Sequence, residues 1–444
     1  MSSSAQFDKK SKSTTRIFIG TKEVAGYLSN LQEKFKSHNF KSELILFEKA
    51  RNFENFSGRH NKLIEYIQRF TFLAVNTNGV KRYFWVLARE VSSLMFLIYA
   101  LNKYDVFLFF FGKSFLKANL DLPILKMFKK RIIFDVSLGS ESRPLYCNGK
   151  ARNLSSKAIY YQTLFKSIKY KWIEFHVNSI IASSKHAQFL RKPFIDRGNL
   201  SNPKPTINLN SIKKKDIPHF SKGFCNDGSL KILHAPSDRD AKGSDLIQQV
   251  IQSLKQEGYQ IDFLEVSSVP HEQLQLLIEE TDIVIDQAYS DKLMPVLAQE
   301  CALQMKPVVI GGYIFEENYE ELEQCSALPI LCSEPNGLKD SIKSLLGSKA
   351  LRKSLSNSAY NFVTSEKNNQ ANLNVYIAAI MNTYPLNKLT DPSKCDYIFG
   401  AGLSKEELRE NLDRVCKYGG FNSLRLKKNS NYEILYRQFM SSNE

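Results

Sequence analysis

Apolar positions between residues 229 and 386 alternate between short continuous runs and stripes at helical spacing. The short runs have the length of buried strands and lie at 231–236, 261–267, 282–287, 306–312 and 327–332. Between them, residues 245–258, 270–280 and 294–304 place apolar side chains three and four positions apart, which predicts helices. Ser244 is the predicted N-cap of the first helix. Strands separated by helices of this length form parallel βαβ units, so we predict an α/β domain with a doubly wound parallel sheet.

The first half of the chain shows the same alternation less regularly. Its predicted strands lie at 16–20, 42–48, 105–111, 131–137 and 178–184, with helical segments between them. The two longest apolar stretches, 91–101 and 105–112, are shorter than the roughly 20 residues that span a bilayer. We therefore expect the first to be a buried helix and the second a buried strand of another α/β domain.

These patterns divide the chain into five predicted segments. Residues 1–15 are polar and form a disordered tail, and residues 16–205 form the N-terminal domain. Residues 206–228 belong to a stretch rich in Asn, Ser, Pro and Lys, which is typical of a linker. The second domain covers 229–386, and residues 387–444 form a C-terminal helical extension.

Composition indicates a globular chain of two domains. It has 444 residues, of which 43% are apolar and 24% are charged. The 61 Lys and Arg residues exceed the 45 Asp and Glu residues by 16, and this basic excess suits polyanions, anionic membrane surfaces or phosphorylated small molecules. The seven cysteines form no CxxC pair and the N-terminus has no apolar signal-peptide core. We therefore expect a cytoplasmic protein that can contact the inner face of a membrane.

Two cations follow the first strand of the second domain, in the segment SDRDAKG. Arg239 and Lys242 stand just before a predicted helix, and helix N-termini attract phosphate. The alternative is a solvated loop in which Asp238 and Asp240 pair with these two cations. The same aspartates could hold a divalent metal, but two adjacent cations already neutralise an anion, so we predict no metal site.

Two residues farther along this domain are candidates for binding a nucleotide. Glu300 lies on the predicted helix 294–304, where its carboxylate could accept hydrogen bonds from a ribose or sugar diol. The alternative is a helix residue that faces solvent. His271 falls at a helix start on the side of the same crevice, although histidines in such places are more often packing residues. Neither GxGxxG nor GxxxxGK[ST] is present, which argues against dinucleotide and P-loop sites.

The basic and aromatic segment KSIKYKWIEFH at 166–176 allows three interpretations. Lysines interleaved with aromatic residues suit nucleic acid or lipid headgroups, but they also occur on an ordinary basic helix face, which we favour. The sequence contains no recognisable nucleic-acid-binding module, so we expect no nucleic-acid partner.

Three runs of the second domain resemble the donor-binding domain of GT-B glycosyltransferases, and family 4 of these enzymes most. They read ILHAPSDRDAKGSDLI, VSSVPHEQLQLLIEETDIVIDQ and VLAQECALQMKPVVIGG. In the first half, IFIGTKEVAGYLSNL and RIIFDVSLGSESR are similar to the first strand with its glycine turn and to a later strand and loop. The resemblance implies a GT-B architecture, with two facing Rossmann-like doubly wound parallel-sheet domains and the N-terminal one on the acceptor side.

The resemblance also implies roles for individual residues. Arg239 and Lys242 would contact the donor diphosphate. Glu300 would be the second glutamate of the family's E-x7-E motif and would bond the ribose, while His271 would lie near the base. Gly26 would let the acceptor-side loop approach the phosphates.

Several positions depart from the family pattern. Lys292 stands where the first glutamate of E-x7-E would fall, and a cation there could pair with an acidic sugar or a phosphate but not accept hydrogen bonds. Leu138 occupies a position that is often histidine in the family. Glu141 and Arg143 are the polar residues left in that loop, and we take them as the catalytic candidates.

The resemblance predicts an enzyme that moves a sugar from a nucleoside-diphosphate sugar to a glycan or lipid-linked acceptor. It implies a metal-independent, hexosyltransferase-type GT-B enzyme in surface polysaccharide or glycoconjugate synthesis, with no cofactor beyond the donor. The rival hypothesis, prompted by Lys292 and Leu138, is a catalytically degraded GT-B scaffold that binds a nucleotide or a partner.

Overall fold

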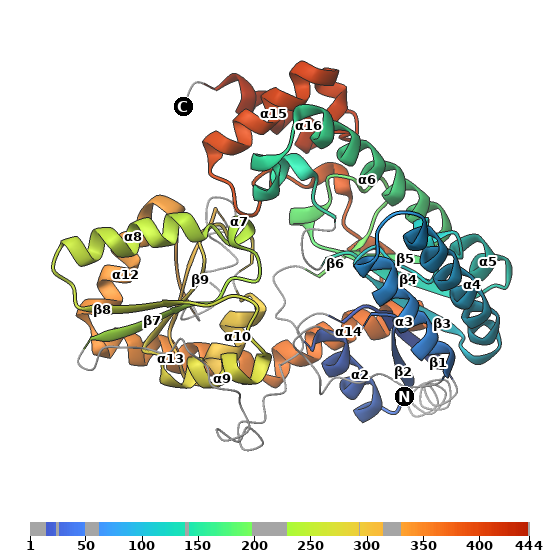
Figure 1. Ribbon diagram of the computed structural model, residues 1–444, viewed down its shortest axis with the longest axis horizontal. Coiled ribbons are helices and arrows are strands. Elements are labelled where there is room, and N and C mark those ends of the chain that lie inside the picture. Colours follow the sequence, from blue (N-terminus) through green and yellow to red (C-terminus); the bar gives the residue numbers. More distant parts are fainter. Residues whose placement is uncertain are drawn as a thin grey trace.

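A computed structural model describes residues 15–23, 26–48, 62–137, 142–197, 229–292, 294–313 and 330–442. Two parallel β-sheets with packed helices lie on opposite sides of the molecule, and a group of C-terminal helices adjoins the first sheet (Figure 1). The predicted linker 206–228 and all but the last residue of the predicted tail 1–15 fall outside the described residues.

The first sheet has six strands in the order β2-β1-β3-β4-β5-β6, and all neighbouring pairs are parallel. Its strands are β1 (Arg16–Thr21), β2 (Lys41–Leu46), β3 (Val106–Phe110), β4 (Arg131–Asp135), β5 (Ser179–Ala182) and β6 (Ile195–Asp196). The order reverses at β1, as it does in a doubly wound sheet. β3 is buried along its whole length, which confirms the strand predicted at 105–112.

Alternate residues of β1 point to two separate cores because side chains alternate across a strand. Ile17 and Ile19 face a core shared with α2 (Tyr27–Ser37) and α14 (Glu366–Met381). Phe18 faces the opposite core, where aromatic rings of the sheet pack against the other helices of the domain. These helices are α3 (Lys62–Asn76), α4 (Val80–Lys103), α5 (Leu122–Met127) and α6 (Ser156–His176).

Helix α14 follows the second domain in the sequence but packs on the first sheet (Figure 1). Tyr376 on this helix is fully buried, and its hydroxyl lies 2.6 Å from that of Tyr27. Arg131 Nε donates to the carbonyl of Ala379 over 2.8 Å. By its packing, the end of the segment predicted as the second domain, 229–386, therefore belongs to the first.

The second sheet has five strands in the order β11-β10-β9-β7-β8, again all parallel. They are β7 (Leu230–His234), β8 (Ile261–Glu265), β9 (Ile283–Gln287), β10 (Val308–Gly311) and β11 (Leu331–Ser333). One face packs on α8 (Ser244–Gln256) and α12 (Leu338–Gly347). The other packs on α9 (His271–Glu280), α10 (Val296–Leu303) and α13 (Lys349–Thr364).

Ser244 is not the N-cap of α8, contrary to the sequence prediction. Gly243 takes that position with φ 67°, and Ser244 is the first helical residue. Ser244 is fully buried, and its hydroxyl forms a 2.8 Å hydrogen bond with Nε2 of His234. The side chain therefore ties the helix to the end of β7 instead of capping the helix.

The C-terminal extension packs on α6 of the first domain. It contains the helices α15 (Lys405–Gly419) and α16 (Asn431–Ser441), with short 3-10 turns at Leu386–Lys388, Pro392–Lys394 and Phe421–Leu424. Helix α15 begins with a capping box formed by Ser404 and Glu407. The hydroxyl of Tyr146 donates to the carbonyl of Leu424 over 3.0 Å, which joins the extension to the segment after β4.

The helix predicted at 91–101 is present, but its predicted burial is wrong. It forms the second half of α4, where Phe96 and Leu97 are buried while Met95 and Ile98 are 57% and 59% exposed. Only one side of α4 packs on the domain. Among the described helices, α4 alone is long and apolar enough to cross a membrane by length and composition.

The predicted fold class is confirmed. Both sheets are parallel and carry helices on both faces, and the two domains are of the Rossmann-like type.

Candidate functional site

The carboxyl ends of the two sheets meet between the domains. β4 leads to Ser137, β5 leads to His186, and β9 leads to Asp291 and Lys292, and these segments contact each other across the domain boundary. Ligands of doubly wound sheets bind beyond the carboxyl ends of the strands. The contact region therefore lies where such a ligand would sit.

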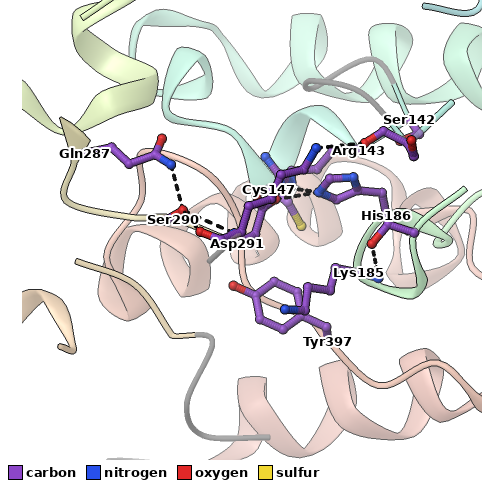
Figure 2. Close-up of polar contacts among 12 residues, drawn as sticks. Ser142, Arg143, Cys147, Lys185, His186, Gln287, Ser290, Asp291 and Tyr397 are labelled. Carbon is purple, nitrogen blue, oxygen red and sulfur yellow. Dashed lines mark hydrogen bonds and ion pairs between the residues drawn. The ribbon is translucent and has the colours of Figure 1, made fainter. Parts of the chain in front are cut away.

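A turn after β9 presents Asp291 and Lys292 to the first domain. Ser290 shapes this turn, because its hydroxyl donates to the carbonyl of Lys292 over 2.7 Å and accepts from the amide of Lys292 over 3.1 Å. Gln287 Nε2 donates to the same hydroxyl over 2.6 Å, so the end of the strand holds the turn (Figure 2).

Arg143, His186 and Asp291 form a polar cluster that joins the domains (Figure 2). Arg143 is 2% exposed, and its Nη2 donates to the Asp291 carboxylate and lies 2.7 Å from Nε2 of His186. Burial, followed by the charge of Arg143, holds the pKa of His186 well below its ordinary value. The imidazole is therefore neutral at pH 7, and its Nε2 lies between Nη2 of Arg143 and the carboxylate of Asp291.

Lys292 crosses to the first domain and donates from Nζ to the carbonyl of Ser137 over 3.2 Å. Burial, followed by the positive charge of Arg197, lowers the pKa of Lys292 to about 7, and Arg143 and Lys185 act in the same direction. This lysine is thus poised between its charged and neutral forms at physiological pH. An anionic group bound beside it would favour the charged form.

A buried carboxylate supports the Ser137 side of the site. Asp135 is fully buried at the end of β4 and accepts from the Ser137 amide over 2.8 Å and from its hydroxyl over 2.6 Å. It also accepts from the hydroxyl of Tyr376 on α14. Arg197 Nη1 donates to the Ser137 hydroxyl over 3.1 Å. These contacts fix the position of Ser137, whose carbonyl accepts from Lys292.

The predicted diphosphate residues Arg239 and Lys242 both lie in α7 (Arg239–Lys242), and both pair with carboxylates. Arg239 pairs with Asp245 at 2.9 Å and with Glu265. Lys242 Nζ lies 2.7 Å from Oδ1 of Asp286, which is fully buried at the end of β9. An incoming anion would compete with these carboxylates for the two cations.

The alternative in which Asp238 pairs with the loop's own cations is wrong. Asp238 caps α7, with Oδ1 accepting from the amide of Ala241 over 3.0 Å, and its Oδ2 lies 2.7 Å from Nζ of Lys150. Lys150 belongs to a 3-10 turn of the first domain, Gly149–Asn153. Asp238 therefore orients the loop and links the two domains.

Two glycines allow the α7 loop to contact the first domain closely. A Cβ on Gly149 would lie 2.7 Å from the carbonyl oxygen of Asp240, and one on Gly402 would lie 2.2 Å from the same atom. Gly402 also has φ 74°, which disfavours other residues. The C-terminal extension thus reaches the predicted diphosphate loop through Gly402.

Glu300 and His271, predicted to bind ribose and base, lie side by side. His271 Nε2 is 2.9 Å from Glu300 Oε1, and Gln275 Nε2 donates to Glu300 Oε2 over 3.1 Å. Glu300 is 4% exposed, so the alternative of a solvent-facing helix residue is wrong. The pair connects the start of α9 with α10 inside the second domain.

Gly26 has φ 69° and precedes α2 directly, where a glycine turn was predicted. The first turn of α2 is already bonded to a carboxylate: Glu23 accepts from the amides of Leu28 and Ser29 over 3.0 and 2.9 Å. Glu23 was missed by sequence reasoning, since one acidic residue before a helix is a common feature. A phosphate approaching this helix end would have to displace it.

Of the two catalytic candidates, Arg143 lies in the interdomain cluster and Glu141 lies outside the described residues. Sequence reasoning assigned no role in the site to Asp135, Ser137, His186 or Asp291. A usable signal existed, because Asp135 and Ser137 lie at the end of the strand predicted at 131–137, and His186 and Asp291 follow the strands predicted at 178–184 and 282–287.

Neither the protein-family models nor the curated proteins contain a match to this chain. Solved structures align over most of its length at low identity. They include the catalytic domain of starch synthase IV from Arabidopsis thaliana bound to ADP and acarbose, at 11% identity, 83% of this chain, 99% of the other and a TM-score of 0.46.

Two further solved structures align to a similar extent. A trehalose-6-phosphate synthase studied with bisubstrate glycomimetics has 9% identity, covers 83% of this chain and 99% of its own, and has a TM-score of 0.44. S. aureus MnaA in complex with UDP has 11% identity, covers 83% and 97%, and has a TM-score of 0.42. The fold assignment above rests on strand order and pairing, and not on these likenesses.

Proposed function

We propose that this chain is a glycosyltransferase that moves a sugar from a nucleoside-diphosphate sugar to a glycan or lipid-linked acceptor. The observation that carries the proposal is the meeting of both sheets' carboxyl ends around Arg143, Arg197 and Lys292. Ligand crevices of doubly wound sheets lie at such ends, and a cluster of cations there favours a phosphorylated ligand.

The proposed mechanism stabilises negative charge on the departing diphosphate. In this mechanism Arg239 and Lys242 exchange their present carboxylate partners for phosphate oxygens as the donor binds. Fixed cations aimed at the leaving group lower the barrier because they need no reorganisation when charge develops. A divalent metal is not required in this scheme, and the first prediction of the scheme is that EDTA has no effect on turnover.

Glu300 is proposed to bind the ribose hydroxyls of the donor. It now accepts from Gln275 and is paired with His271, so ribose hydroxyls would replace one of these partners. Lys292 is proposed to face the transferred sugar. A cation at that place selects an anionic substituent or a sugar phosphate over a neutral hydroxyl.

The rival function is a nucleotide- or partner-binding scaffold without turnover. It is favoured by one observation, that Arg239 and Lys242 are both already neutralised by carboxylates. The two hypotheses agree on nucleotide binding and differ on release of nucleoside diphosphate from the donor.

A measurement of turnover distinguishes the two hypotheses. We would incubate the full chain with UDP-, GDP-, ADP- and dTDP-sugars and measure released nucleoside diphosphate, with and without EDTA. We expect release from one donor class, unchanged by EDTA and at least tenfold slower in Glu300→Gln, because the amide presents one acceptor oxygen and an unsuitable NH2 group to the ribose.

Glu257→Gln is the matched control, since Glu257 is a paired carboxylate of the same domain on the far end of α8. It should release product at the rate of the unmodified chain. Absence of release with every donor, in a chain that still binds one nucleotide, would contradict the proposal and leave the scaffold hypothesis.

A further inference from the structure

Helix α4 carries an exposed apolar stripe along its whole length. The stripe residues are between 42% and 85% exposed and are Val80, Tyr83, Phe84, Leu87, Val91, Leu94, Met95 and Ile98. Their spacings of one, three and four positions place them on one side of the helix, and none of them is charged.

The opposite side of α4 is buried and less apolar than the exposed side. Its buried residues are Ser92, Ser93, Phe96, Leu97 and Ala100. A surface helix of a globular protein normally directs its larger apolar face to the core and its polar face to water. α4 reverses this arrangement, so its outer side chains require a partner other than water.

The exposed apolar side chains continue over three neighbouring helices. On α6 they form a second stripe, Tyr161, Phe165, Ile168, Trp172 and Phe175, each between 36% and 66% exposed. Around α5 and on α3 they are Leu120, Met127, Phe128, Tyr66, Phe72 and Val75. We call the exposed apolar residues of α3, α4, α5 and α6 the apolar surface.

The helices that carry the apolar surface lie side by side (Figure 1), and direct contacts join α3 with α4 and α5 with α6. The amide of Lys117, before α5, donates to Oε2 of Glu90 on α4 over 2.9 Å. Phe70 of α3 stacks on Trp85 of α4, with ring centroids 5.7 Å apart. Trp172 Nε1 of α6 donates to the carbonyl of Asn119 over 3.0 Å, just before α5. Lys126 Nζ of α5 donates to the carbonyl of Phe175 over 2.8 Å. Apolar patches of this extent are unusual on soluble monomers and mark interaction sites.

Positive charge accompanies the apolar surface. The segments 62–76, 80–103, 117–130 and 156–176 contain 14 Lys and Arg residues against four Asp and Glu residues. The exposed cations are Lys62, Arg69, Lys81, Arg82, Lys117, Lys126, Lys129, Lys157 and Lys171. This excess complements the anionic lipids of a cytoplasmic leaflet, and each such cation near the surface adds attraction.

The composition of the surface favours a lipid bilayer over a protein partner. The cores of protein interfaces are depleted in lysine, whereas helices that lie on membranes combine Lys and Arg with Trp, Phe and Leu. Aromatic side chains such as Tyr83 and Trp172 suit the headgroup region. α4 cannot leave the domain without exposing Phe96 and Leu97, so it would lie along the membrane and not across it.

We propose that the apolar surface docks on an anionic phospholipid bilayer, with α4 and α6 lying in the plane of the headgroups. The docking itself does not depend on the proposed function. It would bring the polar cluster around Arg143 close to the membrane, because Lys166 Nζ of α6 donates to the carbonyl of Arg143 over 2.8 Å. If the proposed function holds, a lipid-linked acceptor would reach the site from this side.

Vesicle co-sedimentation of the full chain tests the proposal. The probes are phosphatidylcholine vesicles with and without 30% phosphatidylglycerol, at low and high salt. We expect binding to the anionic vesicles that weakens with salt, and at least a tenfold loss of partitioning in the triple variant Leu87→Gln, Leu94→Gln, Ile98→Gln, because it removes three exposed side chains of the stripe.

A second triple variant tests the charge: Lys81→Glu, Arg82→Glu, Lys129→Glu should lose the preference for anionic vesicles. The control is Leu386→Gln with Ile434→Gln, two exposed apolar residues away from the apolar surface, which should bind like the unmodified chain. Nucleotide-induced stabilisation is measured in every variant and should be unchanged, so that failure of docking is distinguished from failure of the proposed function.

Three outcomes would overturn the proposal. The unmodified chain could bind neither kind of vesicle, or it could bind neutral and anionic vesicles equally at low salt. Alternatively, sedimentation velocity without lipid could reveal a stable dimer that the Leu87, Leu94 and Ile98 substitutions dissociate. That last result would assign the apolar surface to a second copy of the chain.

Discussion

Lys292 illustrates how a single side chain affects the charge between the two domains. Its ammonium group bonds the carbonyl of Ser137 in the other domain and is surrounded by further cations, which lower its pKa to about 7. The same sequence position would carry a glutamate in the family that the chain resembles. A carboxylate there would accept from sugar hydroxyls, whereas the charged form of Lys292 can only donate or attract negative charge.

The lowered pKa of Lys292 makes binding of an anion depend on pH. Without ligand the lysine loses its proton as pH rises through about 7. A diphosphate or an acidic sugar beside it raises that pKa, so the complex holds more protons than the free protein as pH rises above about 7. We therefore expect proton uptake on binding and an affinity that falls as pH rises through this range.

Calorimetry of nucleotide binding in buffers of different ionisation enthalpy measures this uptake. The Lys292→Met variant should lose most of it, because the side chain keeps its length without the titrating group. Equal proton uptake in the variant and the unmodified chain would assign the effect to another group.

Arg143 shows which part of the candidate site can be predicted from the sequence and which part cannot. A polar residue in a loop after a strand is a reasonable candidate, and Arg143 does lie between the domains. Its partners His186 and Asp291 come from separate strand ends, one in each domain. No local pattern connects residues that are 43 and 148 positions away from Arg143 along the chain, because only the folding of both sheets brings them together.

At the scale of elements, periodicity located most strands and helices but could not decide which helix faces were covered. The run at 91–101 was predicted to be buried because it is apolar, yet its apolar stripe faces outward. Burial depends on the neighbours of a helix, and these are set by topology. For the same reason the pattern could not reveal that α14 returns to the first sheet.

Gly149 and Gly402 allow close contact with the α7 loop, and a substitution of Gly402 tests this contact directly. Gly402→Ala forces φ 74° on a residue with a Cβ and places that Cβ against the carbonyl of Asp240. Positive φ alone costs about 1 kcal/mol. Overpacking against fixed backbone adds roughly 1–3 kcal/mol.

Gly258→Ala is the control, since Gly258 also has a positive φ, 94°, but its Cβ would meet open space. Urea unfolding of both variants should place Gly402→Ala lower in stability than Gly258→Ala by at least about 1 kcal/mol, the low end of the overpacking cost. Equal stabilities would mean that the α7 loop does not rest against the C-terminal extension.

At the scale of the whole molecule, the two-sheet architecture was predictable because strand length, helix length and their alternation are local properties of the sequence. The position of one sheet relative to the other was not predictable, since it depends on contacts such as Lys150 with Asp238 and Lys292 with Ser137. The position of the C-terminal extension was likewise not predictable. The extension packs on α6 and contacts α7 through Gly402. Together these contacts bring the strand ends of both domains next to each other.

Our central proposal is that the region between these strand ends binds a nucleoside diphosphate through protein cations. The most direct measurement is thermal unfolding of the full chain with UDP, GDP, ADP, CMP and dTDP, each with and without EDTA. A ligand of the folded state at 100 times its Kd adds about 2.7 kcal/mol of stability, which gives a clear rise in Tm.

We expect one nucleoside diphosphate to stabilise the chain regardless of EDTA, with the effect lost in Lys242→Ala. Lys343→Ala should respond like the unmodified chain, because Lys343 pairs with Glu257 on the same domain away from the strand ends. Stabilisation that disappears with EDTA would contradict the metal-independent site, and no stabilisation by any of the five nucleotides would contradict the central claim.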